Sequence, residues 1–327
     1  MVIARELQRA LTDAGHEAHV VITPDHGFGR QSSAYLETWR TDVKTVDGRP
    51  VDRVISFRYP SYAVRHPRHV CWLNHTMREY YDLWPQFSGS LSPQGRVKES
   101  VRRTLIHAAD RYLLTRNVQG LFVQSRTIQQ RLAMWPSLTS AVLYPPAPHR
   151  PYRAEAYGPE FFFVSRLNRL KRADLLIRAL HIHEAAGISV VIAGEGEERA
   201  ALERLTGELG LEGRVTFAGR LSDAQMLDRF ATCRAVVFPP LQEDYGFVTV
   251  EAFASRRAVI TCRDSGGPAE LVEDGVNGFL CDPTPESIAR ALRRLADDPG
   301  LAERMGTAAF ETGARLNWDD TVGRLVE

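Results

Sequence analysis

Two carboxylates, Glu243 and Glu251, flank a tight turn between an expected strand and an expected helix. The apolar run 235–238 stops at two prolines, and Gly246 permits the turn into the helical stretch 247–255. In open α/β sheets this edge binds ligands, and a helix start offers unpaired amides to an anion. The segment could therefore hold an anion together with hydroxyl groups of a sugar or ribose. Spacing alone leaves open that both are surface glutamates.

Two cations, Arg166 and Lys171, follow the expected strand 161–164. A guanidinium binds phosphate oxygens through a fork and an ammonium acts as a point charge. Together they could neutralise the charge of a bound phosphate group. Arg169 and Arg172 lie beside them, so a solvated basic loop is the plainer alternative.

Other candidate motifs are less specific. Gly194-Glu195-Gly196 follows the expected strand 190–193, but Arg199 stands where a dinucleotide fingerprint needs its third glycine. His75 lies between a strand and a turn, where a lone histidine is more often structural. The turn 265–268 also follows a strand, and an ordinary loop explains it equally well. The chain has no Asp-x-Asp and no Cys-x-x-Cys, so the sequence indicates no metal site.

The elements that must position these residues alternate between strands and helices. From residue 158 onward the expected strands are 161–164, 190–193, 215–217, 235–238, 258–261 and 278–281. In the first half they are 17–22, 53–57, 69–73, 120–123 and 141–144. Alternation of this kind predicts parallel, doubly wound sheets. A length of 327 residues fits two domains, which we place at 1–148 and 158–316 with a proline-rich linker between them.

Taken together, these motifs resemble the retaining glycosyltransferases of family 4, also called glycosyl transferases group 1. The resemblance rests on the paired glutamates eight positions apart and on Arg166-Leu167-x-x-x-Lys171 after the first strand of the second domain. It implies the α/β GT-B fold, in which two Rossmann-like domains face a cleft and a last helix, here 317–327, returns to the first domain. The family more often has glycine where Ser165 and Arg172 stand.

The resemblance also implies roles for individual residues. Arg166 and Lys171 would grip the diphosphate, Glu243 would contact the donor sugar, and Glu251 would contact the ribose. His75 would face the sugar from the first domain. The amides expected near the diphosphate and sugar are those of Tyr245, Gly246, Phe247 and Val248. The residues expected to border the nucleoside and base are Gly194, Gly219, Arg220 and Leu221.

The function implied is transfer of a sugar, with retained anomeric configuration, from a UDP- or GDP-linked donor to a hydroxyl of a sugar or lipid-linked acceptor. In such enzymes the leaving phosphate accepts the acceptor's proton, so Glu243 would orient and stabilise and no metal or further cofactor is expected. Polysaccharide, glycolipid or glycoconjugate assembly in a bacterial-type envelope is the expected setting. A GT-B sugar epimerase and a non-catalytic nucleotide-sugar-binding remnant are the alternatives.

Charge is distributed unevenly along the chain. Residues 1–150 carry a net charge of +8 and residues 151–327 carry −7. Much of the excess lies in the basic helix expected at 96–116, where Val101, Leu105, Ala108 and Tyr112 share one face. This helix either packs on its own domain, with its charges solvated or facing the acidic half, or contacts an anionic membrane surface or an anionic acceptor. We expect no nucleic-acid partner.

Compartment and chain start give two further expectations. The four cysteines look like small core residues, and no apolar run is long enough for a membrane helix, which predicts a cytoplasmic protein with possible peripheral contact at the membrane face. The helix expected at 2–14 begins at Met1 with no strand or glycine-rich turn before it. We therefore hypothesise that Met1 is a misplaced or internal start and that the first domain lacks its first strand.

Overall fold

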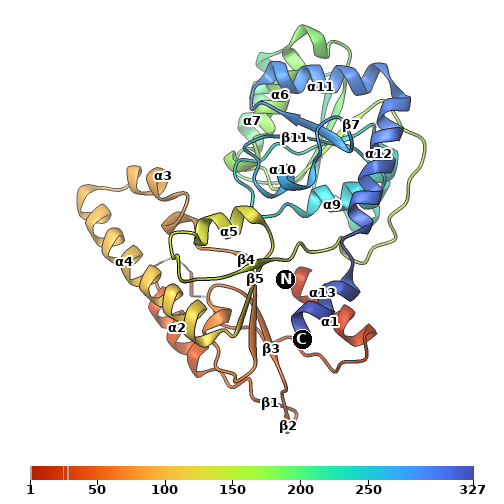
Figure 1. Cartoon of the computed structure of the whole chain (residues 1–327). Helices are drawn as coiled ribbons and strands as arrows, with labels where there is room; N and C mark the ends of the chain where they lie inside the picture. The colour runs from red at the N-terminus through yellow and green to blue at the C-terminus, as the bar shows by residue number, and fades with distance from the viewer. Residues whose placement is uncertain (1, 25, 28) are drawn as a thin grey trace. The chain divides into compact units, whose positions relative to one another are not determined.

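The computed structural model describes residues 2–24, 26–27 and 29–327 (Figure 1). Met1, on which the hypothesis of a misplaced start depends, lies outside the described residues. The chain forms two compact units. The first comprises the described residues up to Pro145 together with Trp318–Glu327, and the second comprises Pro146–Asn317.

The second unit is built on a six-stranded, fully parallel sheet. Its strand order is β12-β11-β10-β7-β8-β9. The strands are β7 (Phe161–Val164), β8 (Val190–Ala193), β9 (Val215–Gly219), β10 (Val236–Val237), β11 (Val259–Cys262) and β12 (Gly278–Cys281). Each predicted strand of this half is present, with β10 shorter than expected because Pro239 cannot donate to a ladder.

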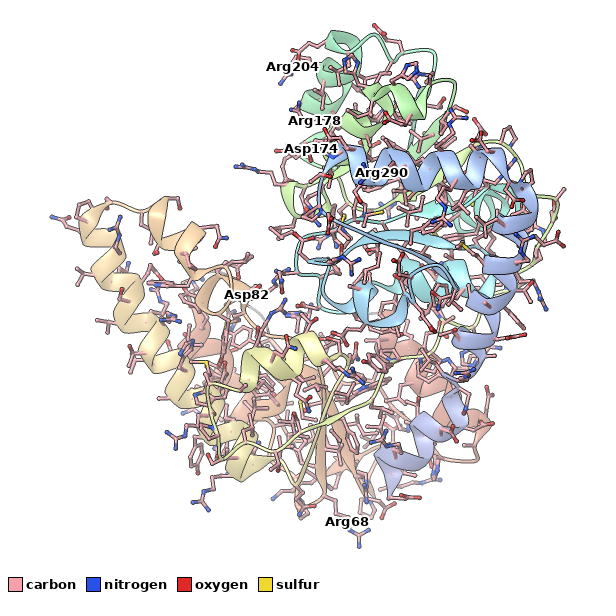
Figure 2. The ribbon with its side chains drawn as sticks, turned by 45° about the horizontal axis from the view of Figure 1, so that its top comes forward. Arg68, Asp82, Asp174, Arg178, Arg204 and Arg290 are labelled. Carbon is pink, nitrogen blue, oxygen red and sulfur yellow. The ribbon has the colours of Figure 1, made fainter. Side chains whose placement is uncertain are left out.

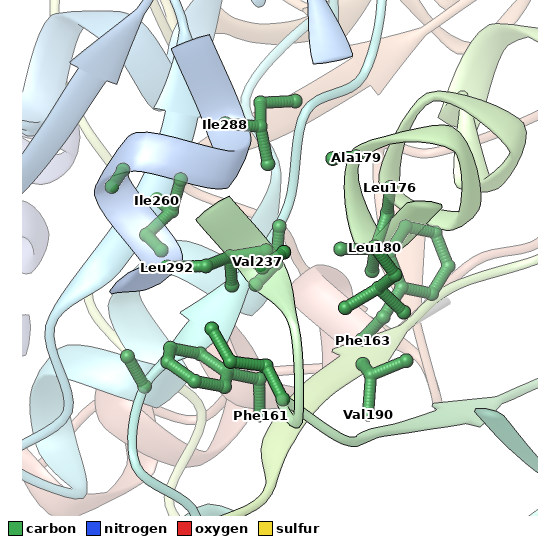
Figure 3. Packing of buried hydrophobic residues seen from close by; sticks show 14 of the residues in the cluster. Phe161, Phe163, Leu176, Ala179, Leu180, Val190, Val237, Ile260, Ile288 and Leu292 are labelled. Carbon is green, nitrogen blue, oxygen red and sulfur yellow. The ribbon is translucent and has the colours of Figure 1, made fainter. Parts of the chain in front are cut away.

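Helices cover this sheet and close its core (Figure 3). They are α6 (Ala173–His181), α7 (Arg199–Glu208), α8 (Asp223–Thr232), α9 (Phe247–Ala254), α10 (Gly267–Leu271), α11 (Pro285–Asp297) and α12 (Pro299–Ala314). Leu176 and Leu180 of α6 pack with Phe163 of β7, and Leu292 of α11 belongs to the same buried cluster. Burial on both faces explains why these strands read as continuous apolar runs.

The first unit has a smaller parallel sheet of order β3-β4-β5-β6. Its strands are β3 (Val54–Arg58), β4 (His69–His75), β5 (Gly120–Val123) and β6 (Ala141–Val142), with a separate hairpin of β1 (Thr45–Val46) and β2 (Arg49–Pro50). Its helices are α1 (Val2–Asp13), α2 (Gln31–Arg40), α3 (Trp84–Gly89), α4 (Pro93–Tyr112), α5 (Arg126–Leu132) and α13 (Trp318–Val326).

The strand predicted at 17–22 is wrong. These residues join no sheet, and Val20, Val21 and Ile22 are exposed. A strand in a parallel sheet needs a neighbour that receives its backbone hydrogen bonds, and β3 forms the edge of the described sheet without pairing to this segment. Residues 17–21 instead line a hollow together with residues of α1 and β3.

Helix α13 is part of the first unit although it ends the chain. Trp318 packs edge-on against Trp72 of β4, with ring centres 6.3 Å apart. The guanidinium of Arg53 donates to the Leu325 carbonyl at 3.1 Å, and α1 lies beside α13 (Figure 1). Two helices that are distant in sequence thus pack against each other in the first unit.

The basic helix packs on its own domain, but not through the apolar face that the sequence singled out. Val101, Leu105, Ala108 and Tyr112 of α4 are exposed. The face that packs inward carries Glu99, Ile106 and Asp110. Buried tyrosine hydroxyls satisfy both carboxylates, so this helix packs on its domain through hydrogen bonds as well as apolar contacts.

Candidate functional site

At the carboxyl ends of β7 and β10, the structure brings Lys171 and Glu243 together. The Lys171 ammonium donates to Glu243 Oε2 at 2.5 Å. Lys171 lies in the 3₁₀ turn Arg169–Lys171 and is largely buried, with its ammonium 5.6 Å from the centre of the Phe238 ring. Two of the residues selected by sequence as donor-binding groups therefore meet directly, 72 positions apart in the chain.

The loop that carries Glu243 is held by a neighbouring glycine pair. Glu243 accepts from the Gly267 amide at 2.9 Å and donates its own amide to Ser265 at 2.9 Å. A Cβ on Gly266 would lie 2.4 Å from the Glu243 carbonyl oxygen, and one on Gly267 would lie 2.5 Å from the Tyr245 Cα. Only glycine permits so close an approach, so the turn 265–268 positions the Glu243 loop.

Gly246 starts α9 with φ +80°, a conformation that glycine adopts without strain. A Cβ there would lie 2.8 Å from the Phe238 ring and 2.8 Å from Pro268. Tyr245 is buried with its ring edge-on to Phe247, and Phe247 and Val248 form the first turn of α9. The first amides of a helix have no partner four residues earlier, so this turn can present donors to an anion.

Arg166 is exposed at the end of β7, on a loop that runs against 194–196. The Leu167 amide donates to the Glu195 carbonyl at 2.9 Å. A Cβ on Gly194 would lie 1.8 Å from the Ser165 carbonyl oxygen. These glycines thus fit a close backbone approach that positions Arg166, independently of any dinucleotide fingerprint.

Arg172 ties three loops of this site together. Its Nη1 and Nη2 donate to the two Asp264 oxygens at 2.8 and 2.7 Å. Its Nε and Nη2 also donate to the carbonyls of Pro239 and Pro240, each at 2.7 Å. The backbone of Arg172 adopts φ +51°, where glycine is favoured. The side chain therefore fixes the Lys171 turn against the segment that leads to Glu243.

Glu251 lies on α9 but is buried away from Lys171's ion pair. Its Oε1 accepts from Arg150 Nη1 at 2.8 Å and from the Tyr152 hydroxyl at 3.2 Å. Burial raises the pKa of Glu251 to about 7, against the Arg150 charge and the Tyr152 hydrogen bond, which lower it. In this structure the candidate ribose-binding carboxylate is thus held by the segment that follows the proline-rich stretch.

The residues expected near the base lie at the end of β9. Gly219 adopts φ +63°, and its carbonyl accepts from the Gly194 amide at 2.7 Å. Arg220 is exposed and Leu221 is half-buried. The two expected nucleoside loops, after β8 and after β9, therefore touch through their backbones.

His75 ends β4 in the first unit. Its Nδ1 lies 3.0 Å from the Thr76 carbonyl and its Nε2 lies 3.4 Å from the Arg58 guanidinium. Burial lowers its pKa, which favours the neutral imidazole. In the turn that follows, Arg78 makes an ion pair at 2.7 Å with Asp82, labelled in Figure 2.

Two structural features are absent from the described part of the chain. Among residues 2–24, 26–27 and 29–327, no group of three His, Cys, Asp or Glu side chains could hold a metal ion. In the same part of the chain, no helix is both long and apolar enough to cross a bilayer. Cys71, Cys233, Cys262 and Cys281 are buried and free, as small core residues are.

Sequence reasoning missed several residues that hold the site. Arg150, Tyr152, Arg172 and Asp264 bind or position the predicted residues through side chains, and Gly266 and Gly267 do so through close backbone approach. The one available signal was Ser-Gly-Gly-Pro after a strand, which an ordinary loop explained equally well. The partners of Glu251 and Arg172 lie 99, 101 and 92 positions away, so no local pattern indicated them.

The family model described as Glycosyl transferases group 1 matches residues 149–312. A D-inositol 3-phosphate glycosyltransferase of Streptomyces griseus subsp. griseus is 34% identical over 169 residues, which are 48% of this chain and 36% of that relative. An alpha-D-kanosaminyltransferase of Streptomyces kanamyceticus is 36% identical over 163 residues, covering 47% and 42%. The match therefore spans less than half the length of these relatives.

Solved structures resemble both units. WaaG, a glycosyltransferase involved in lipopolysaccharide biosynthesis, has a TM-score of 0.71 at 16% identity and covers 98% of this chain and 94% of its own. HepE of Anabaena, solved with UDP and glucose, has a TM-score of 0.60 at 18% identity and covers 84% and 98%. At these identities the likeness shows the fold, and the predicted α/β GT-B class is confirmed.

Proposed function

Because this chain belongs to the glycosyl transferases group 1 family, as its motifs predicted, we propose that it is a retaining transferase that uses a nucleoside diphosphate sugar. It moves the sugar from a UDP- or GDP-linked donor to a hydroxyl of a sugar or lipid-linked acceptor during glycoconjugate assembly. The observation that carries the proposal is the contact of Lys171 with Glu243 at the ligand-binding edge of the second unit's sheet.

The Lys171–Glu243 pair suits a site that exchanges partners when a donor binds. A diphosphate would compete for the Lys171 ammonium, because the diphosphate of a nucleotide sugar carries two negative charges and a carboxylate carries one. Glu243 would then be free to accept hydrogen bonds from sugar hydroxyls. Arg166, already exposed on its loop, supplies a second cation with a forked geometry.

The remaining residues take the roles that the family resemblance implies. The first turn of α9, at Phe247 and Val248, directs its amides toward the negative charge that develops on the leaving diphosphate. Glu251 accepts hydrogen bonds from the ribose hydroxyls. Its present partner Arg150 either leaves it or binds the nucleotide at the same time. Gly194, Gly219, Arg220 and Leu221 border the nucleoside and base.

The proposed chemistry needs no protein nucleophile. The acceptor hydroxyl attacks the face from which the nucleotide departs, and its proton passes to the departing phosphate oxygen. Glu243 orients the sugar and stabilises positive charge at the reacting carbon. His75, whose pKa is lowered by burial, is the residue to which the family resemblance assigns a contact with the sugar.

What relatives are described as binding supports a nucleotide-linked donor. HepE of Anabaena has been solved with UDP-glucose, and the two relatives named above are glycosyltransferases. No observation favours the epimerase or the non-catalytic alternative. The whole protein's acceptor and setting belong to the proposal, since less than half of each named relative is matched.

The proposal is tested by incubating the purified chain with a panel of UDP- and GDP-sugars, with and without sugar or lipid-linked acceptors. We expect nucleotide release that depends on one donor and rises with an acceptor. Proton NMR of the product should show the donor's anomeric configuration. Recovery of an epimerised donor, or binding without any transfer across the panel, would contradict the proposal.

A further inference from the structure

Helix α4 turns its apolar stripe toward solvent. Val97, Val101, Leu105 and Tyr112 are 68%, 58%, 66% and 58% exposed. Val97, Val101 and Leu105 are spaced four residues apart, so they lie along one side of the helix. Helices of globular proteins normally bury such a stripe, so its exposure calls for a partner.

The inward face of α4 explains why the stripe is left outside. Glu99 accepts from the Tyr80 hydroxyl at 2.9 Å, and Asp110 accepts from the Tyr81 and Tyr62 hydroxyls at 2.6 and 2.5 Å. Arg103 donates to the Tyr80 carbonyl at 2.8 Å. These bonds fix the rotation of α4 about its axis, and the apolar side faces outward as a result.

The exposed stripe continues into a groove shared with α2. This hollow of about 770 Å³ is lined chiefly by apolar side chains, among them Leu36, Trp39, Val101, Leu105 and Tyr112. Leu36 of α2 is itself 49% exposed. α2 and α4 run beside each other at the left of Figure 1. The apolar surface therefore extends over two helices.

Most of the exposed charges around this surface are positive. Arg96, Lys98 and Arg111 of α4 are exposed, and Arg116 follows in the next turn. Both acidic residues of α4, Glu99 and Asp110, are buried. On α2 the exposed Glu37 has a partner, because its Oε2 lies 2.8 Å from His26 Nε2. A partner that meets the stripe therefore meets cations as well.

We propose that the surface formed by Val97, Val101, Leu105 and Tyr112 of α4 with Leu36 of α2 docks on an anionic lipid bilayer. The aliphatic and tyrosine side chains enter the boundary between headgroups and acyl chains, and the flanking cations contact lipid phosphates. Helix α4 is about 30 Å long at 20 residues, and its charges keep it in the plane of the interface.

The test is sedimentation of the full chain with vesicles of phosphatidylcholine, with or without phosphatidylglycerol. We expect binding to the phosphatidylglycerol vesicles that falls when NaCl is raised. Val101→Ser with Leu105→Ser should lower the partition coefficient about ten-fold, because two inserted aliphatic groups are lost. Lys98→Glu with Arg111→Glu should lower it for phosphatidylglycerol vesicles alone. Val276→Ser, which changes a 44% exposed valine of the second unit, is the matched control.

Each outcome of this experiment either supports or overturns the proposal. Equal binding by wild type and Val101→Ser/Leu105→Ser, or no preference for phosphatidylglycerol, would overturn the proposal. So would sedimentation-velocity evidence that the wild type is a dimer which the same double substitution dissociates, since the stripe would then be covered by a second copy. Unchanged far-UV circular dichroism of the variants would show that the fold is intact.

Discussion

The guanidinium of Arg172 and the carboxylate of Asp264 meet through two parallel hydrogen bonds, 2.8 and 2.7 Å long. The same guanidinium binds the carbonyls of Pro239 and Pro240. Arg172 thus connects the turn that carries Lys171 with the loop that carries Glu243. The left-handed backbone of Arg172 costs about 1–2 kcal/mol relative to glycine, and the four side-chain bonds offset that cost.

We predict that losing this connection lowers transfer without abolishing it. Arg172→Ala should reduce kcat/KM roughly ten-fold, because the two loops no longer hold Lys171 and Glu243 in register. Arg172→Gly should have a similar rate but be about 1 kcal/mol more stable to urea than Arg172→Ala, since glycine relieves the φ +51° backbone. Asp264→Asn combined with Arg172→Ala should be less than additive. Full additivity would show that the contact does not position the site.

Loss of either diphosphate cation should slow transfer strongly. Lys171→Ala or Arg166→Ala is expected to lower turnover by roughly 10²-fold or more, the scale for one preorganised charge stabiliser. Arg169→Ala is the matched control, because Arg169 is exposed on the same turn and should change turnover little. Steady-state nucleotide release measures all three. Near-normal rates for both Lys171→Ala and Arg166→Ala would remove these residues from the site.

Substitutions of the two glutamates should impair different steps. Glu243→Gln should harm transfer more than nucleotide binding, because Glu243 is assigned to the sugar. Glu251→Gln should weaken binding of the bare nucleoside diphosphate, because Glu251 is assigned to the ribose. Calorimetry with UDP and GDP separates these effects. Equal losses of nucleotide affinity in both variants would reject the division of roles.

Transfer should survive chelation. In the proposed mechanism, Arg166, Lys171 and the first amides of α9 carry the stabilisation that other transferases obtain from a divalent cation. Activity after dialysis against EDTA should therefore match untreated enzyme, with and without added Mg²⁺ or Mn²⁺. A strict requirement for either ion would reject the mechanism.

Asp110 should make the first unit less stable as pH rises. Burial raises the pKa of this carboxyl from 3.8 to about 6, although Tyr35, Tyr62 and Tyr81 donate to it. The folded state then binds this proton more tightly than the unfolded chain does. The contribution of Asp110 to the free energy of unfolding therefore declines as pH rises from 3.8 to about 6. Asp110→Asn should remove this part of the dependence of the unfolding free energy on pH.

Tryptophan fluorescence during urea unfolding measures this effect selectively. All five tryptophans lie in the first unit, so their signal reports on that unit and not on the second. The difference in unfolding free energy between wild type and Asp110→Asn should change between pH 3.8 and about pH 6 and be constant outside that range. A constant difference throughout would contradict the assignment of the raised pKa.

Much of this protein could be predicted from sequence because the determining patterns are local. The strands from Phe161 to Cys281 are apolar runs bounded by turn residues, and parallel strands buried on both faces leave that signal. Glu243 and the Arg166–Lys171 segment lie on loops that follow strands, so their place at one sheet edge followed from chain order. That the family is glycosyl transferases group 1 was likewise determined by short motifs.

Tertiary structure alone decided the remainder. Residues 17–22 have strand-like composition, but a strand exists only where a neighbour accepts its backbone hydrogen bonds. The stripe of Val101 and Leu105 specified an amphipathic helix, yet the hydrogen bonds from Tyr80, Tyr62 and Tyr81 to its polar side decided which face is buried. The partners of Glu251 and Arg172 come from distant segments. Composition determines what a segment can bury, and the hydrogen-bond partners brought by folding determine what it does bury.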